Sequence, residues 1–230
     1  MKKRKLRDIE VSAMGLGCMG FSHGYGPVPQ HNDSVKLIQT AYDMGCTFFD
    51  TAEGYAAGAN EELVGESLKP IRNHVVLATK LLIPDESDKS VREVIREHLD
   101  ASLKRLQTNY VDLYYQHRVN KNIPVEEVAE CMGELIREGK IRGWGQSQDT
   151  EDEIQRANVI TPLTAIQSEF SMMERMFEKD VIPVCEELVI GFVPFSPLAS
   201  GFLSGKYTQN NKFVGDDVRR AITRYQKENV

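Results

Sequence analysis

The stretch VVLATKLLIPDESDKSVREVIREHLDASLKRLQTNYVDLYYQH, residues 75–117, predicts a complete β-α-β unit. Its first run, VVLATK (75–80), carries apolar residues on both faces, which is typical of a strand in a parallel sheet covered by helices. The segment 90–106 repeats its apolar residues with a helical period, and VDLYYQH (111–117) is rich in residues that favour strands. A strand, a helix and a second strand in this order indicate an α/β fold.

The same alternation extends over the whole chain. We expect strands at 11–17, 47–51, 75–80, 111–117, 141–147, 163–168 and 190–195, with one βα unit in each interval. The individual helices that we expect are 34–45, 60–69, 90–106, 125–139 and 178–188; Asn32 or Asp33 is the N-cap of the first, and Gly45 is its left-handed end. Such a series closes most naturally into a (βα)8 barrel of the TIM type, and a doubly wound open sheet is the alternative. Because no linker or shift in composition interrupts the pattern, we expect a single domain over residues 1–230.

Composition excludes several functional classes. The chain has 230 residues, of which 41% are hydrophobic and 27% charged, and its net charge is −6 with basic residues scattered, so nucleic acid is not an expected partner. The N-terminus is charged and no apolar stretch is long enough to span a membrane, which predicts a cytoplasmic protein with no membrane partner. The four cysteines lie far apart, so neither a disulfide framework nor a metal site is indicated.

Ionisable side chains stand where three of the expected strands end. Asp50 closes one strand and is followed by Tyr55, while Lys80 and His117 close the next two. Each has an ordinary structural explanation when taken alone: a cap, a solvated lysine, a satisfied histidine. Together they would meet at one barrel mouth as a phenol proton donor, an ammonium that lowers its pKa, a carboxylate counter-ion and an imidazole. This set suits protonation of a carbonyl oxygen as hydride reaches its carbon.

Six stretches resemble motifs of the aldo-keto reductase family. DTAEGY (50–55), VVLATK (75–80) and DLYYQH (112–117) look like its catalytic tetrad motifs, whereas GKIRGWGQS (139–147), TAIQSEFS (164–171) and FSPLASGFLSGKY (195–207) are similar to its cofactor-binding stretches. The resemblance implies an NADP(H)-dependent oxidoreductase acting on a small aldehyde or ketone. Tyr55 would be the general acid, Lys80 and Asp50 would tune it, and His117 would orient the carbonyl.

The resemblance also implies a set of cofactor contacts. The residues expected to bind NADP(H) are Gly17, Met19, Asp50, Ser147, Gln148, Gln167, Phe195, Ser196, Leu198 and Gly201. Ser147 and Gln167 would hold the nicotinamide carboxamide, and Phe195 would stack on the ring. Ser196, Leu198 and Gly201 would line the diphosphate.

Two local features invite other interpretations. Residues 15–20 fit GxGxxG, but FSHGYGPVP (21–29) follows and cannot form the helix that a Rossmann fold requires, so we expect a loop at the barrel mouth. Gln146 departs from the family pattern, and we expect its side chain to face the barrel interior without an obvious partner. Tyr114 and Tyr115 are expected to alternate between the helix layer and the barrel core.

The end of the chain leaves two functional classes open. After residue 195 we find no eighth strand and no counterpart of the family's adenosine-binding βα unit, so we expect a C-terminally truncated barrel with seven of eight strands. Its first and last strands would be unpaired, which predicts self-association through the exposed strand edges. The chain is then either an NADP(H)-dependent reductase or a non-catalytic binding or scaffold protein, an inactive remnant of the family.

Overall fold

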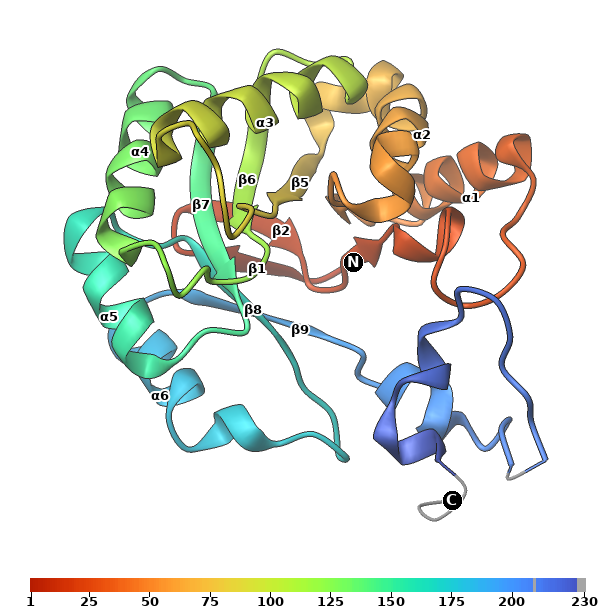
Figure 1. Ribbon diagram of the computed structural model, residues 1–230. Coiled ribbons are helices and arrows are strands. Elements are labelled where there is room, and N and C mark those ends of the chain that lie inside the picture. Colours follow the sequence, from red (N-terminus) through yellow and green to blue (C-terminus); the bar gives the residue numbers. More distant parts are fainter. Residues whose placement is uncertain (209, 227–230) are drawn as a thin grey trace.

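The computed structural model describes residues 1–208 and 210–226 and contains one curved sheet of seven parallel strands (Figure 1). Each strand pairs with the next along the chain, in the order β3-β4-β5-β6-β7-β8-β9. This arrangement confirms the predicted barrel of (βα)8 type with seven strands in the described residues, of which β3 and β9 are the edges. Their bounds are β3 Leu16–Gly17, β4 Phe48–Asp50, β5 Val76–Leu81, β6 Val111–Gln116, β7 Ile141–Ser147, β8 Ala165–Glu169 and β9 Gly191–Phe195.

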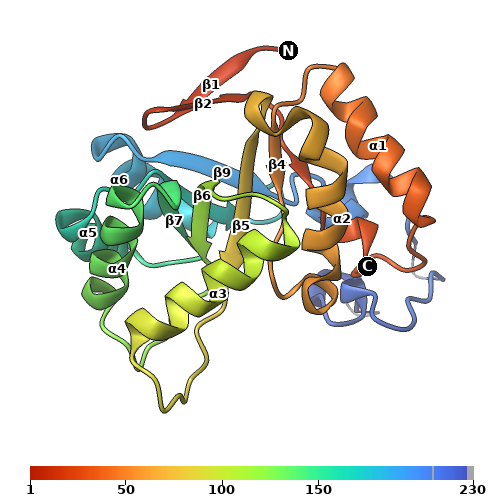
Figure 2. The ribbon, with the colours of Figure 1, turned by 90° about the horizontal axis from the view of Figure 1, so that it is seen from above.

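In the part of the chain that the structure describes, six α-helices cover the outer face of this sheet, as the two perpendicular views show (Figures 1 and 2). They are α1 His31–Asp43, α2 Ala59–Leu68, α3 Val91–Arg105, α4 Val125–Arg137, α5 Glu151–Ile160 and α6 Val181–Glu187. Helix α5 was not among the individually expected helices. Its sequence signal is a capping box, in which the Thr150 side chain accepts from the backbone of Glu153 and the Glu153 carboxylate accepts from Thr150.

The first helix begins earlier than expected. Its N-cap is Gln30, without a side-chain cap, so Asn32 and Asp33 lie inside the first turn and the predicted capping role is wrong. The preceding loop holds residues 15–20 in a short strand and a 3-10 turn at Met19–Phe21, with no α-helix before residue 31. The Rossmann interpretation of this GxGxxG stretch is therefore excluded. Gly45 has φ +92° and ends the helix as predicted.

An N-terminal hairpin covers one end of the barrel. Strands β1 Lys3–Leu6 and β2 Ile9–Ser12 are antiparallel, so the predicted strand 11–17 is wrong as a unit: residues 11–12 belong to the hairpin and 16–17 to the barrel. Leu6 and Ile9 are buried against interior residues of the sheet, and the Arg7 guanidinium donates to the backbone oxygens of Leu163 and Leu188. Figure 2 shows the hairpin at one end of the sheet, beyond the ends of β4 and β5.

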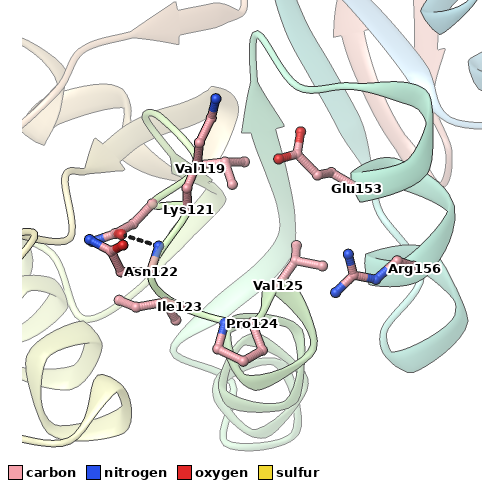
Figure 3. A pocket seen from close by; sticks show the side chains of 9 residues that line it. Val119, Lys121, Asn122, Ile123, Pro124, Val125, Glu153 and Arg156 are labelled. Atoms are coloured by element: carbon pink, nitrogen blue, oxygen red, sulfur yellow. Dashed lines mark hydrogen bonds between the residues drawn. The ribbon is translucent and has the colours of Figure 1, made fainter.

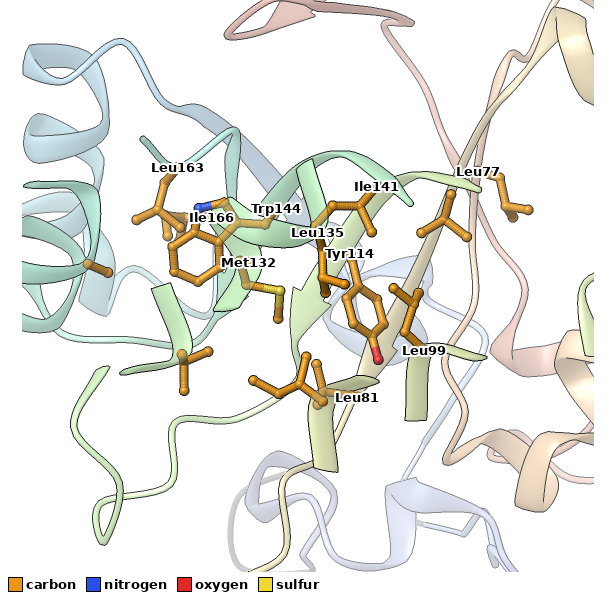
Figure 4. Packing of buried hydrophobic residues seen from close by; sticks show 14 of the residues in the cluster. Leu77, Leu81, Leu99, Tyr114, Met132, Leu135, Ile141, Trp144, Leu163 and Ile166 are labelled. Carbon is orange, nitrogen blue, oxygen red and sulfur yellow. The ribbon is translucent and has the colours of Figure 1, made fainter. Parts of the chain in front are cut away.

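Strand alternation divides the core into two clusters. Tyr114 and Trp144 point to the helix layer, where they pack with residues of α3 and α4 (Figure 4), whereas Tyr115 lies in the barrel interior. The expected division of the two tyrosines is confirmed. Gln146 is two residues after Trp144 and therefore faces the helices, contrary to our expectation, and its amide donates to the Gln116 side chain at 3.2 Å.

The segment after β9 packs beside the loop between β3 and α1 (Figure 1). The amide of Val218 donates to the Gly24 oxygen at 2.9 Å, and the Arg219 guanidinium lies over the rings of Tyr25, Tyr207 and Phe213. Within the described residues, no helix is both long and apolar enough to cross a bilayer.

Candidate active site

Lys80 forms the centre of a polar cluster at the carboxyl end of the sheet. Its side chain is fully buried and its ammonium pairs with the Asp50 carboxylate, the last residue of β4. The same ammonium donates to the Thr51 backbone oxygen at 2.7 Å and to the Tyr55 hydroxyl at 3.4 Å. β4 and β5 are parallel neighbours, with Asp50 level with Ala78, so their carboxyl ends bring Asp50 and Lys80 together. Burial lowers the pKa of Lys80, but Asp50 and Tyr55 outweigh this effect and raise it above its ordinary value, so the lysine is held charged.

His117 completes the expected group of four. It follows β6, and its ring lies edge-on to Tyr55 with the ring centroids 5.9 Å apart. Burial, then the positive charges of Lys80 and Arg118, lower the pKa of His117 to about 3. The imidazole is therefore neutral at physiological pH and can form a hydrogen bond with a carbonyl group without adding charge.

The environment of Tyr55 differs from our expectation in one respect. Lys80 does pull the pKa of Tyr55 down, but burial of the phenol is the larger effect and the pKa lies above its ordinary value. Tyr55 is therefore a neutral phenol whose hydroxyl oxygen accepts a hydrogen bond from the Lys80 ammonium. A group of this kind keeps its proton for donation, and the nearby cation stabilises the phenolate that donation leaves. The ring of His23, a residue that the sequence does not single out, lies tilted at 49° to the Tyr55 ring, with the ring centroids 5.5 Å apart.

Gln167, on the opposite side of the barrel, is hydrogen-bonded to this cluster. Its side-chain amide, on β8, donates to the second carboxylate oxygen of Asp50 at 2.9 Å. The residue expected to contact the nicotinamide carboxamide therefore also holds Asp50. Asp50 thus receives Lys80 on one oxygen and Gln167 on the other.

Ser147 and Gln148 lie at the end of β7. Ser147 is buried and its hydroxyl oxygen accepts from the Arg118 guanidinium at 3.1 Å, which leaves its own O–H free to donate. Gln148 is exposed and has φ +62°, and its backbone N–H donates to the Gln167 backbone oxygen at 3.0 Å. Both residues therefore border the polar cluster.

The remaining expected cofactor residues lie at the two edges of the sheet. On β3, Gly17 is level with Asp50 and exposed, and no atom lies within 4 Å of the position that a Cβ would take. Met19 follows in the 3-10 turn. At the other edge, half-buried Phe195 ends β9 and leads into a loop with positive φ at Ser196 and Gly201; Leu198 in this loop is exposed.

Sequence reasoning missed two ionisable residues beside the cluster. Arg118 follows His117 directly, and its Nη1 donates to the His117 oxygen and to Ser147. Asp149 follows Gln148, and neither of its buried carboxylate oxygens has a hydrogen-bond partner. Burial, with Glu153 as a smaller cause, holds the pKa of Asp149 well above its usual range. The available signal was position, because each residue directly follows one predicted for the site.

A separate cavity of about 320 Å³ lies between residues 119–125 and α5 (Figure 3). It contains none of the four clustered residues. Its Arg156 is paired with Glu126 and Asp152, and its Glu153 belongs to the cap of α5, so these charges serve the helix layer. Within residues 1–208 and 210–226, no group of three or more His, Cys, Asp or Glu side chains is placed to hold a metal ion.

Comparisons with known proteins show which family and which solved structures the chain resembles. The model of the Aldo/keto reductase family matches residues 13–229. The "Probable aldo-keto reductase 1" of Glycine max is 42% identical over 97% of this chain, which spans 66% of that relative's length.

Two solved structures share the fold. A glycerol dehydrogenase from Gluconobacter oxydans has a TM-score of 0.85 and 30% identity, over 99% of this chain and 72% of its own. An aldo/keto reductase from Klebsiella pneumoniae in complex with NADP and acetate has a TM-score of 0.76 and 32% identity, over 90% of this chain and 72% of its own.

Proposed function

Because the chain belongs to the aldo/keto reductase family, we propose that it is an oxidoreductase that uses NADP(H) to interconvert a small aldehyde or ketone and the alcohol. The observation that carries the proposal is the contact of one buried ammonium, Lys80, with both the Asp50 carboxylate and the Tyr55 hydroxyl. A free tyrosine is a weak acid at neutral pH, and a cation beside its hydroxyl favours proton donation because it stabilises the phenolate that remains.

In this proposal, Tyr55 donates its proton to the carbonyl oxygen during reduction. Lys80 stabilises the phenolate that forms, and Asp50 keeps Lys80 charged in a site where burial alone would favour the neutral amine. His117, uncharged, donates a hydrogen bond to the same oxygen and fixes its direction toward Tyr55.

The residues at the carboxyl end of the sheet fit a nicotinamide cofactor, whose chemistry when bound is to supply or accept the hydride. The open space above Gly17 lets a ligand approach the backbone beside Asp50. Ser147 has a free O–H to donate, and Phe195 offers a half-buried aromatic ring at the opposite edge. Ser196, Leu198 and Gly201 would line the diphosphate. The Klebsiella pneumoniae relatives in complex with NADP or NADPH support the choice of cofactor.

We test the proposal by titrating the protein with NADPH, following the nucleotide fluorescence, and by measuring turnover of a panel of aldehydes. Tyr55→Phe should lower kcat by several orders of magnitude and leave NADPH affinity nearly unchanged, because it removes the proton and keeps the ring. His117→Ala should lower kcat/KM less. Equal turnover by Tyr55→Phe would remove Tyr55 from the mechanism, and NADPH binding without any turnover would favour the scaffold alternative.

We further infer one domain over residues 1–230, a cytoplasmic location and association of copies through the sheet edges. The four cysteines are all buried free thiols, which suits a reducing compartment. Edge strands β3 and β9 each pair with one neighbour in the described sheet. Sedimentation velocity over a concentration series measures the association directly, and a concentration-independent monomer would contradict it.

A further inference from the structure

Arg118 is a cation at the mouth of the site that no part of the proposed chemistry uses. It directly follows His117 and is exposed, while Lys80, the other cation nearby, is fully buried and paired with Asp50. Arg118 forms no ion pair with any residue in the described parts of the chain. The mouth therefore carries one positive charge that no ion pair balances within residues 1–208 and 210–226.

The guanidinium is held from one side and open on the other. Both of its hydrogen bonds come from the same nitrogen, Nη1, which donates to the His117 backbone oxygen and to the Ser147 hydroxyl. No described residue accepts from Nε or Nη2. These two nitrogens form the flat edge of the guanidinium that binds a carboxylate with two parallel hydrogen bonds.

The neighbouring acidic group does not occupy this edge. Asp149 is close enough to influence Arg118 electrostatically, but its buried oxygens form no hydrogen bond with it. The charge of Arg118 also acts on the two residues that would meet the carbonyl: it contributes to the lowered pKa of His117, and it offsets a small part of the rise that burial causes in the pKa of Tyr55. The open edge and the reacting groups therefore share one mouth.

We propose that Arg118 selects substrates that carry a carboxylate near the reacting aldehyde or ketone group, by binding that carboxylate through Nε and Nη2. This inference rests on the proposed reductase function and names its substrate class. The anchoring of Nη1 by His117 and Ser147 fixes the guanidinium before the substrate arrives, which reduces the entropy lost on binding.

The test compares matched acids and esters. We would measure kcat/KM with NADPH for 3- and 4-carboxybenzaldehyde and for their methyl esters, in the original protein and in Arg118→Met. Charge-assisted bonds to an exposed arginine predict that at least one acid is preferred over its ester by about tenfold or more. Arg118→Met should lower the acid-to-ester ratio of kcat/KM by at least tenfold. Added salt should lower this ratio in the original protein but not in Arg118→Met.

Controls separate the outcomes. Arg4→Met removes an exposed arginine on β1 that contacts just the Lys3 backbone oxygen, and it should leave the acid-to-ester ratio unchanged. Equal losses for acids and esters in Arg118→Met would mean that Arg118 only orients Ser147, and would overturn the inference. Calorimetric titration with benzoate isolates the proposed function: Arg118-dependent benzoate binding without turnover of any aldehyde contradicts the reductase proposal alone, whereas turnover with an unchanged ratio contradicts the carboxylate proposal alone.

Discussion

Replacing Lys80 by Met should destabilise the fold as well as the chemistry. The side chain of Lys80 is 1% exposed and that of its partner Asp50 is 16% exposed, so the substitution leaves a largely buried carboxylate without its counter-ion. Gln167 would remain as its one side-chain donor among the described residues. Breaking a buried pair from one side costs about 3–5 kcal/mol of unfolding free energy. Because Asp50 keeps some contact with solvent and the Gln167 bond, we expect about 3 kcal/mol.

A double-mutant cycle distinguishes the charge pair from mere packing. Asp50→Asn leaves a buried ammonium beside neutral oxygens and should cost a similar amount, whereas Lys80→Met/Asp50→Asn buries no net charge. The double variant should therefore be about 2–3 kcal/mol more stable than the sum of the single effects predicts. The exposed pair Lys89–Glu97, tested as Lys89→Met and Glu97→Gln, should show a coupling below about 1 kcal/mol.

Urea unfolding followed by fluorescence provides the measurement. The chain has one tryptophan, Trp144, which is fully buried with its indole N–H bonded to the Thr161 oxygen, so its emission reports loss of the core. If the two single substitutions change the free energy of unfolding additively, or if the Lys80→Met protein is as stable as the original, Lys80 and Asp50 do not stabilise each other and the reasoning is refuted.

Three further predictions follow from other parts of the structure. Burial and nearby positive charges lower the pKa of His117 to about 3, and burial raises that of Tyr55 above its ordinary value, so His117 is neutral and Tyr55 protonated between about pH 5 and pH 9. The value of kcat/KM for reduction should be flat over that range and fall at higher pH, and a maximum confined to pH 7 would contradict this. A Cβ at Gly65 would lie 2.6 Å from the Leu106 backbone carbon, so Gly65→Ala should lower the free energy of unfolding by about 1–3 kcal/mol, whereas Gly54→Ala, with no atom within 4 Å, should change it by less than about 0.5 kcal/mol in the same urea assay. Turnover should survive EDTA, and chelator-sensitive activity restored by one divalent ion would overturn the metal-free mechanism.

The sequence predicts which side chains meet at the site better than it predicts how deeply each one is buried or which face of the sheet it occupies. Asp50, Lys80 and His117 could be brought together from sequence because parallel strands place their carboxyl ends at one edge of a sheet. The direction of the pKa of Tyr55 could not, since it depends on how much water the folded chain removes from the phenol. The expectation for Gln146 is wrong because Gln146 lies two residues after Trp144, a large apolar residue of the helix layer, and side chains two residues apart on a strand share a face.

The N-terminal hairpin escaped prediction for a different reason. The segment 3–12, KRKLRDIEVS, is short and charged, and its few apolar residues show no strong periodicity. The local sequence therefore gives no clear signal for two strands. Tertiary contacts stabilise the hairpin instead. Leu6 and Ile9 pack against interior residues at the end of the barrel that the hairpin covers, and the Arg7 guanidinium donates to backbone oxygens of residues more than 150 positions away. Contacts at that separation leave no trace in a window of ten residues.

The bond between Gln167 and Asp50 shows why such a site needs the curvature of the whole sheet. The two residues are 117 positions apart and stand on β8 and β4, between which β5, β6 and β7 intervene, so a flat sheet would hold them far apart. Gly145 on β7 permits the close packing: a Cβ there would lie 2.3 Å from the Ala165 backbone oxygen and 2.6 Å from the ring of Tyr115. The glycine therefore allows β7 and the Tyr115 ring to pack closely against Ala165, which lies two residues before Gln167 on β8. Its role depends on the space that its missing side chain leaves, which no search for reactive residues would detect.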